Sequence, residues 1–180
     1  HRYSSAASDV YKRQNLFSVE DRVALVTGGG TGIGKIIAEV LAKSGSKVYI
    51  TSRKLDVIKK TAEEINLTKP KYNVNFFSSD ISSENGINEL VDEFINNEKY
   101  LDILINNSGV SWGAPLGNFP YHAWDRVMKL NVAGLFHLTQ CLLPYLSKKA
   151  SLDYPSRIIN IGSVMGLSLI HISEPTRHLL

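Results

Sequence analysis

Short apolar runs alternate along the chain with stretches whose apolar residues recur every three or four positions. The run over 22–27, rich in β-branched residues, ends in glycines, and Ile33, Ile36 and Val40 then recur at helical spacing until Gly45 supplies a stop signal. Further strands are predicted over 47–51, 74–77, 101–106 and 157–161, and further helices over 55–65, from Ser82/Ser83 to about 94, and over 121–146. Strands this apolar, separated by helices, predict a parallel sheet covered on both faces, a doubly wound α/β fold.

Composition narrows the class of protein. The chain has 180 residues, 43% of them hydrophobic and 21% charged, which is enough for one domain with a core. Its formal net charge of +3 comes from scattered basic residues, so neither a nucleic-acid partner nor a membrane face is expected. The only cysteine, Cys141, is interpreted as a buried structural thiol, and no metal site is expected. No targeting segment is visible, and a soluble, cytoplasmic protein acting on a small molecule is expected.

Both ends differ in character from the rest of the chain. Residues 4–14 (SSAASDVYKRQ) and 167–177 (LSLIHISEPTR) show no periodicity that matches the core, and each resembles the translation of a transposase-type sequencing adapter. Residues 1–14 and 167–180 are therefore expected to be non-native tails. Residues 15–166 are expected to be one native nucleotide-binding domain whose sheet is incomplete after its fifth strand.

The glycine-rich loop between the first strand and first helix is suited to bind a pyrophosphate, because helix amides and the helix dipole face it. It contains no GxGxxG pattern. As TGxxxGIG it resembles the loop of the classical short-chain dehydrogenase/reductase family, a Rossmann fold. This resemblance implies cofactor contacts from the following residues of the loop: Gly28, Gly30, Thr31, Gly32, Ile33 and Gly34.

Two rival interpretations of the loop fit less well. The extended branch of the family has TGxxGxxG and would need glycine at Thr31. A triphosphatase phosphate loop, GxxxxGK, would need a hydroxyl residue for magnesium after Lys35, where Ile36 stands. Ile36 is expected on the buried face of the helix and Lys35 on its exposed first turn.

Later motifs resemble the same family in the same order. Asn106-Asn107-Ser108-Gly109 is similar to its NNAG motif, which implies that Asn107 and Gly109 line the cofactor site. Asp80 and Ile81 resemble the pair that contacts the adenine. Residues 129–134 resemble the helix with the catalytic asparagine, here Asn131, and residues 159–163 resemble the strand end with the catalytic serine, here Ser163. The resemblance covers residues 16–166 and is nearest to 3-oxoacyl-acyl-carrier-protein reductases.

The end of the second strand indicates which cofactor is preferred. An arginine there suits the 2′-phosphate of NADP, whereas a carboxylate suits the ribose hydroxyl of NAD. The residues are Ser52, Arg53 and Lys54, and no Asp or Glu follows until Asp56. We therefore expect Arg53 to favour NADP(H) over NAD(H).

The family's reaction also needs a tyrosine that exchanges the substrate proton and a lysine that lowers its pKa, spaced YxxxK after the serine. Residues 164–180 contain neither tyrosine nor lysine. Tyr145 and Lys149 have the spacing but precede Ser163, so they are interpreted as a packing residue and a helix-end charge.

The sequence thus predicts that the parent protein is an NADP(H)-dependent reductase of a carbonyl compound, such as a 3-oxoacyl thioester or another ketone. The resemblance implies a homo-oligomer. The chain as given is expected to be inactive. The alternative is a non-catalytic dinucleotide-binding or regulatory module, and the substrate itself is not indicated.

Overall fold

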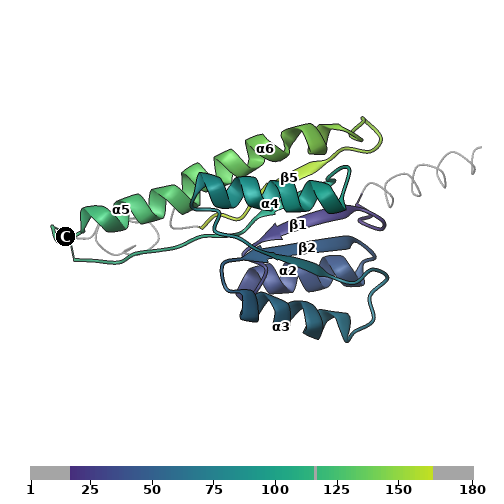
Figure 1. Ribbon diagram of the computed structural model, residues 1–180, viewed down its shortest axis with the longest axis horizontal. Helices are drawn as coiled ribbons and strands as arrows, with labels where there is room; N and C mark the ends of the chain where they lie inside the picture. Colours follow the sequence, from purple (N-terminus) through teal and green to yellow (C-terminus); the bar gives the residue numbers. More distant parts are fainter. Residues whose placement is uncertain (1–16, 116, 164–180) are drawn as a thin grey trace, which may run out of the picture.

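Five parallel strands form one sheet in the order β3-β2-β1-β4-β5 (Figure 1). The strands are β1 (Val23–Thr27), β2 (Lys47–Ser52), β3 (Asn75–Ser78), β4 (Ile103–Asn106) and β5 (Arg157–Asn160). The computed structural model describes residues 17–115 and 117–163, so both tails predicted to be non-native lie outside the described residues. The doubly wound α/β fold predicted from the sequence is confirmed.

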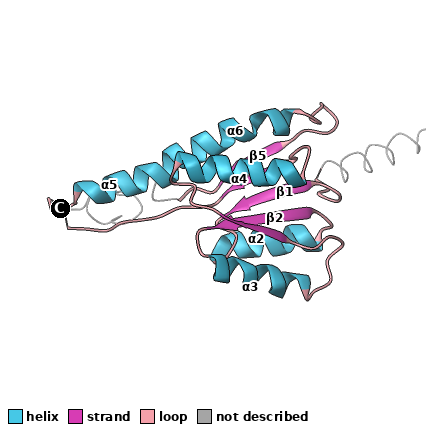
Figure 2. Cartoon of the chain, viewed as in Figure 1, coloured by secondary structure: helices cyan, strands magenta, loops and turns pink. Residues whose placement is uncertain are grey.

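Helices cover the sheet on both faces (Figure 2). These helices are α2 (Gly32–Lys43), α3 (Leu55–Asn66), α4 (Glu84–Asn97) and α6 (Leu135–Ser147), whereas α5 (Tyr121–Met128) extends beyond the sheet in Figure 1. Helices α2 and α3 lie on one side, and α4 and α6 lie together on the other. Within the described residues no helix is long and apolar enough to cross a membrane.

Alternate side chains of β1 enter two separate cores. Val23 and Leu25 pack toward α4 and α6, whereas Ala24 and Val26 pack toward α2 and α3. All four are at most 3% exposed, as expected for a central strand buried on both faces. The edge strand β5 differs, because Ile158 and Ile159 are 42% and 44% exposed.

The predicted buried face of α2 is wrong. Ile36 is 62% exposed, and the residues that are buried are Gly34, Ala38 and Ala42. These small residues follow one another at intervals of four and let the helix backbone approach the sheet closely, so the larger isoleucine is turned outward. Ile33 and Val40 are also mostly exposed.

The long helix predicted over 121–146 is interrupted. Residues Lys129–Gly134 form a π-helical turn, η1, between α5 and α6. A π-turn inserts one extra residue into a helix and is frequent at functional sites. This turn carries Asn131.

Cys141 is only partly buried, contrary to prediction, and its sulfur lies 3.7 Å from the His137 Nε2 atom. Burial and the negative charge of Glu84 raise the pKa of the Cys141 thiol. Among the described residues no cluster of three potential metal ligands occurs.

Candidate functional site

A cavity of about 380 Å³ opens where the carboxyl ends of the parallel strands meet. This edge is the usual ligand site of a doubly wound sheet. The cavity is lined by Gly28, Gly30, Thr31, Ser52, Arg53, Lys54, Val57, Asp80, Ile81, Asn107, Ser108, Gly109 and Leu130. Eight of these residues were predicted from the sequence as cofactor contacts.

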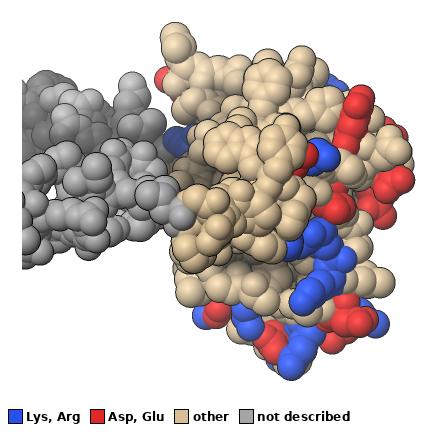
Figure 3. Space-filling view, turned by 90° about the vertical axis from the view of Figure 1, so that its left-hand side faces the viewer, with Lys and Arg blue, Asp and Glu red and all other residues tan. Residues whose placement is uncertain are grey.

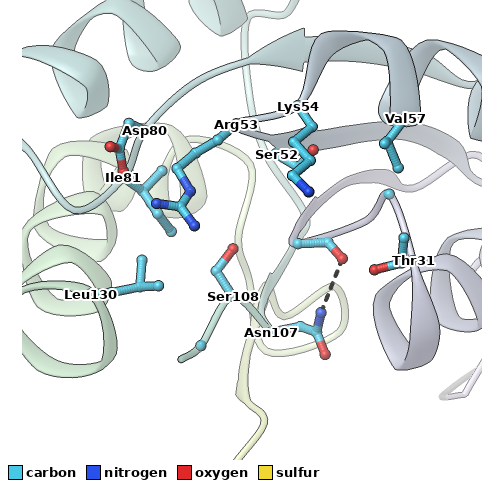
Figure 4. Close-up of a pocket in the computed structure, with 13 residues that line it drawn as sticks. Thr31, Ser52, Arg53, Lys54, Val57, Asp80, Ile81, Asn107, Ser108 and Leu130 are labelled. Carbon is cyan, nitrogen blue, oxygen red and sulfur yellow. Dashed lines mark hydrogen bonds between the residues drawn. The ribbon is translucent and has the colours of Figure 1, made fainter. Parts of the chain in front are cut away.

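The remaining predicted residues fall into two groups. Gly32, Ile33 and Gly34 lie in the first turn of α2, behind the lining formed by Thr31. Asn131 and Ser163 do not line this cavity. Sequence reasoning missed Val57 and Leu130, which reach the cavity from helical segments, and Ser108, whose side chain Figure 4 shows at its floor.

The loop after β1 is held in place by Thr27 and Asn107. The backbone amides of Asn107 and Ser108 each donate to Thr27 Oγ1 over 2.9 Å. Asn107 Nδ2 donates to the carbonyl oxygens of Thr27 and Gly28 at 3.0 and 3.3 Å, and Figure 4 draws the second of these bonds. The β1 loop and the β4 loop are therefore one hydrogen-bonded unit.

Glycines allow this unit to form. Gly28 has a φ of 65°, which L side chains rarely adopt. A Cβ atom added to Gly34 would lie 2.3 Å from the Gly28 oxygen and 2.5 Å from Asn107 Nδ2. At Gly32, by contrast, an added Cβ would meet no atom within 4 Å. The protein thus packs tightly behind the loop and leaves its outer side open, as a phosphate requires.

We expect Gly34→Ala to lower the free energy of unfolding by about 2 kcal/mol, because overpacking of this order forces backbone shifts. Urea denaturation of the full-length protein measures the loss. Gly113→Ala is the matched control, since a Cβ at Gly113 would meet nothing within 4 Å. Equal midpoints for the two variants would contradict the close packing of the loop.

Two basic side chains enter the cavity from the end of β2. Figure 4 shows Arg53 and Lys54 pointing into it, with the Arg53 guanidinium group turned toward Ile81 and Asp80. Partial burial acts to raise the pKa of Asp80, but hydrogen bonds from Ser82 and the nearby Arg53 charge outweigh it, and the pKa is lowered. The cavity therefore contains the cations of Arg53 and Lys54 and the ionised carboxylate of Asp80. The Asp80 Oδ1 atom already accepts hydrogen bonds from the Ser82 amide and hydroxyl.

Lys35, which a triphosphatase would aim at phosphate, does not line the cavity. Its ammonium group forms an ion pair with Glu64 of α3, which lowers the pKa of that carboxylate. The Lys35 side chain is 35% exposed, so it is partly buried rather than exposed as predicted.

Asn131 uses its whole side-chain amide to hold the loop after β4. Its Oδ1 accepts from the Val110 amide and its Nδ2 donates to the Val110 carbonyl, both at 2.9 Å. Asn106, at the end of β4, donates to Thr139 Oγ1 of α6 and to Asn160 Oδ1 of β5. Ser163 lies exposed three residues after β5.

Tyr145 and Lys149 lie at the opposite end of the sheet. The Tyr145 carbonyl accepts from the Leu101 amide, ahead of β4, and the Lys149 ammonium lies over the rings of Tyr100 and Tyr154, at 4.4 and 4.8 Å. Both residues thus lie near the amino ends of the strands, whereas the cavity opens at their carboxyl ends.

Comparison with known proteins agrees with this geometry. The family model described as short chain dehydrogenase matches residues 22–173. The chain belongs to the short-chain dehydrogenase family. A rhamnolipids biosynthesis 3-oxoacyl-[acyl-carrier-protein] reductase of Pseudomonas aeruginosa is 42% identical over 152 residues, which are 84% of this chain and 58% of that protein. A 3-oxoacyl-[acyl-carrier-protein] reductase of Aquifex aeolicus is 36% identical, over 83% of this chain and 58% of its own length.

Solved structures of the short-chain dehydrogenase family superpose on the chain. The Pseudomonas aeruginosa RhlG/NADP complex has a TM-score of 0.81 at 42% identity and covers 86% of this chain and 59% of its own. L-Sorbose reductase of Gluconobacter frateurii, complexed with NADPH and L-sorbose, has a TM-score of 0.74 at 25% identity and covers 81% and 53%. The chain spans less than two thirds of the length of these relatives.

Proposed function

We propose that the full-length protein is an NADP(H)-dependent carbonyl reductase acting on a small carbonyl or alcohol compound or an acyl thioester. The observation that carries the proposal is the end of β2, which places Arg53 and Lys54 in the cavity and is followed by no Asp or Glu before Asp56. Two cations there suit the 2′-phosphate that distinguishes NADP from NAD. The NADP-bound relatives support the same cofactor.

The lining residues suggest an order in which a dinucleotide would lie in the cavity. The pyrophosphate lies against Gly30 and Thr31, which line the cavity, and Gly32 at the start of α2, where an added Cβ would meet no atom within 4 Å. Asp80 and Ile81 bind the adenine, while Asn107 and Gly109 line the way toward the nicotinamide. When bound, the cofactor supplies or accepts the hydride.

The remaining chemistry falls to side chains of this protein. Ser163 donates a hydrogen bond to the substrate oxygen, which stabilises the charge that develops there. Asn131 holds the Val110 backbone, and with it the loop that follows the NNSG motif, in the position the substrate requires. A tyrosine and lysine beyond Ser163 in the full-length protein would complete the proton transfer.

The experiment is to express the full-length protein and follow NADPH oxidation with a 3-oxoacyl thioester and a panel of simple ketones. Turnover of at least one carbonyl, lost on Ser163→Ala, is the expected result. A protein that binds NADPH tightly but turns over no carbonyl would instead be the non-catalytic module.

We also propose that residues 15–166 are the native part of this chain. The family match extends to residue 173, beyond residue 166, so it does not fix where the native sequence ends. Sequencing the transcript past the Gly166 codon tests this boundary. A continuing frame that encodes YxxxK supports the enzyme. A stop codon soon after Gly166 supports the module.

We propose that the full-length protein is a homo-oligomer that assembles through the α5–α6 face. Large apolar side chains stand exposed along it: Tyr121, Trp124, Met128, Val132, Phe136 and Leu143. Figure 3, which looks at the molecule from the α5 end, shows mostly uncharged surface in its upper middle, with Asp and Glu side chains toward the right edge. An exposed apolar stripe of this length is typical of an interface.

Phe136→Asp should therefore weaken self-association by about 2 kcal/mol or more, roughly 30-fold, because a charge would be buried in the interface. Light scattering across a dilution series measures the change. Leu67→Asp is the control, because Leu67 is 82% exposed at the end of α3, on the other side of the sheet. Equal behaviour of the two variants would place the interface elsewhere.

A further inference from the structure

The loop after β3 is packed between two glycines on different helical segments. A Cβ atom added to Gly86, in the first turn of α4, would lie 2.3 Å from the Asp80 carbonyl oxygen. One added to Gly134, at the end of the π-turn η1, would lie 2.0 Å from the next carbonyl oxygen, that of Ile81. Neither position can carry a side chain without moving the loop.

The two contacts differ in what they connect. On the α4 side the loop is already bonded by its own helix cap, since the Ser83 amide and hydroxyl both donate to the Asp80 oxygen, at 3.2 and 3.1 Å. This contact is local in sequence. The Gly134 contact instead joins the loop to a segment more than fifty residues away, and that segment carries Asn131.

The π-turn contacts both the cavity and the loop after β4. Leu130 lines the cavity together with Asp80 and Ile81, and Figure 4 shows its side chain below Ile81. The next residue, Asn131, bonds the Val110 backbone in the loop after β4. A helix without the extra π-turn residue would present these neighbours differently, because the insertion shifts the helix phase.

We propose that Gly134 is a positioning residue that joins the adenine-binding loop to the turn carrying Asn131, so that the two move as one unit. The inference rests on the proposed cofactor site. Binding of the adenine end of the cofactor then orders the Asn131 turn, although no part of the adenosine reaches the substrate. Alanine at position 134 separates the two, since the Ile81 oxygen would have to move from 2.0 Å to at least 3.0 Å from the new Cβ.

The test without any variant uses adenosine 2′,5′-bisphosphate, which carries the adenine and the 2′-phosphate but no nicotinamide. On the full-length protein it should slow hydrogen exchange of the amides of residues 130–135 by about fivefold, as expected when binding stabilises a locally opening segment. Binding with no change in exchange there overturns the inference and leaves the proposed function standing. If the protein binds neither this probe nor NADPH, both are overturned.

The variant test separates positioning from loss of stability. Gly134→Ala should raise the Kd for adenosine 2′,5′-bisphosphate and lower kcat at saturating NADPH, each by about tenfold, because displacements near 1 Å are costly at reacting centres. Gly45→Ala, which places alanine at a φ of 85° before β2 and away from the cavity, is the stability control and should change neither value. Equal Kd and kcat values for Gly134→Ala and Gly45→Ala overturn the inference. If Gly134→Ala does not fold, the hydrogen-exchange measurement on the unaltered protein is the test.

Discussion

Arg53→Asp in the full-length protein is expected to weaken NADPH binding by about 10- to 100-fold, since a hydrogen bond between charged groups contributes about 1.5–3 kcal/mol. The guanidinium group stands in the cavity at the end of β2, where a 2′-phosphate would lie. Aspartate removes this partner and places a negative charge against the phosphate. Binding of NADH should change far less, because the new carboxylate can accept a bond from the ribose 2′-hydroxyl.

Fluorescence titration with both cofactors at two salt concentrations measures the effect. Lys59→Asp makes the same change of net charge at an exposed position on α3 that does not line the cavity, so it controls for the overall field of the protein. An equal loss of affinity for NADPH and NADH in Arg53→Asp would sink the assignment of the 2′-phosphate site to this residue.

Much of the site could be predicted because the fold is parallel. Carboxyl ends of parallel strands share one edge, so residues that follow β1, β2, β3 and β4 had to gather there once the strands were recognised. Gly28, Arg53, Asp80 and Asn107 each follow a different strand, and all four line one cavity. The sequence did not indicate the strand order, and the order β3-β2-β1-β4-β5 comes from the structure.

Sequence reasoning failed where the result depends on how closely a helix packs against the sheet or on a local change of helix type. Hydrophobicity favoured Ile36 for the buried face of α2, whereas close contact with the sheet selects Gly34 and Ala38. The signal was present as small residues four apart after a glycine-rich turn. The π-turn left no such signal, because one inserted residue hardly disturbs the helical period over 121–146. Leu130 was missed for that reason, and so was the bond between Asn131 and Val110.

The 180-residue chain, produced as written, is expected to show no reductase activity. General acid–base catalysis contributes about 10²- to 10⁴-fold, and no tyrosine or lysine follows Ser163 in this chain to provide it. Tyr145 and Lys149 cannot take over, because Lys149 is held between Tyr100 and Tyr154 near the amino ends of the strands. In the roles proposed for them, Ser163 and Asn131 would orient a substrate, but no tyrosine would donate a proton to the substrate oxygen.

The same chain is expected to associate or precipitate, since Ile158, Ile159 and Leu143 leave apolar surface exposed at and beside the edge strand. To test for activity, NADPH oxidation is measured for this chain and for the full-length protein, with a 3-oxoacyl thioester and simple ketones as substrates. Static light scattering tests the association. Tyr145→Phe is the decisive control. Turnover by the 180-residue chain that disappears in Tyr145→Phe would show that this tyrosine reaches a substrate after all, and that the catalytic acid lies at the other end of the sheet.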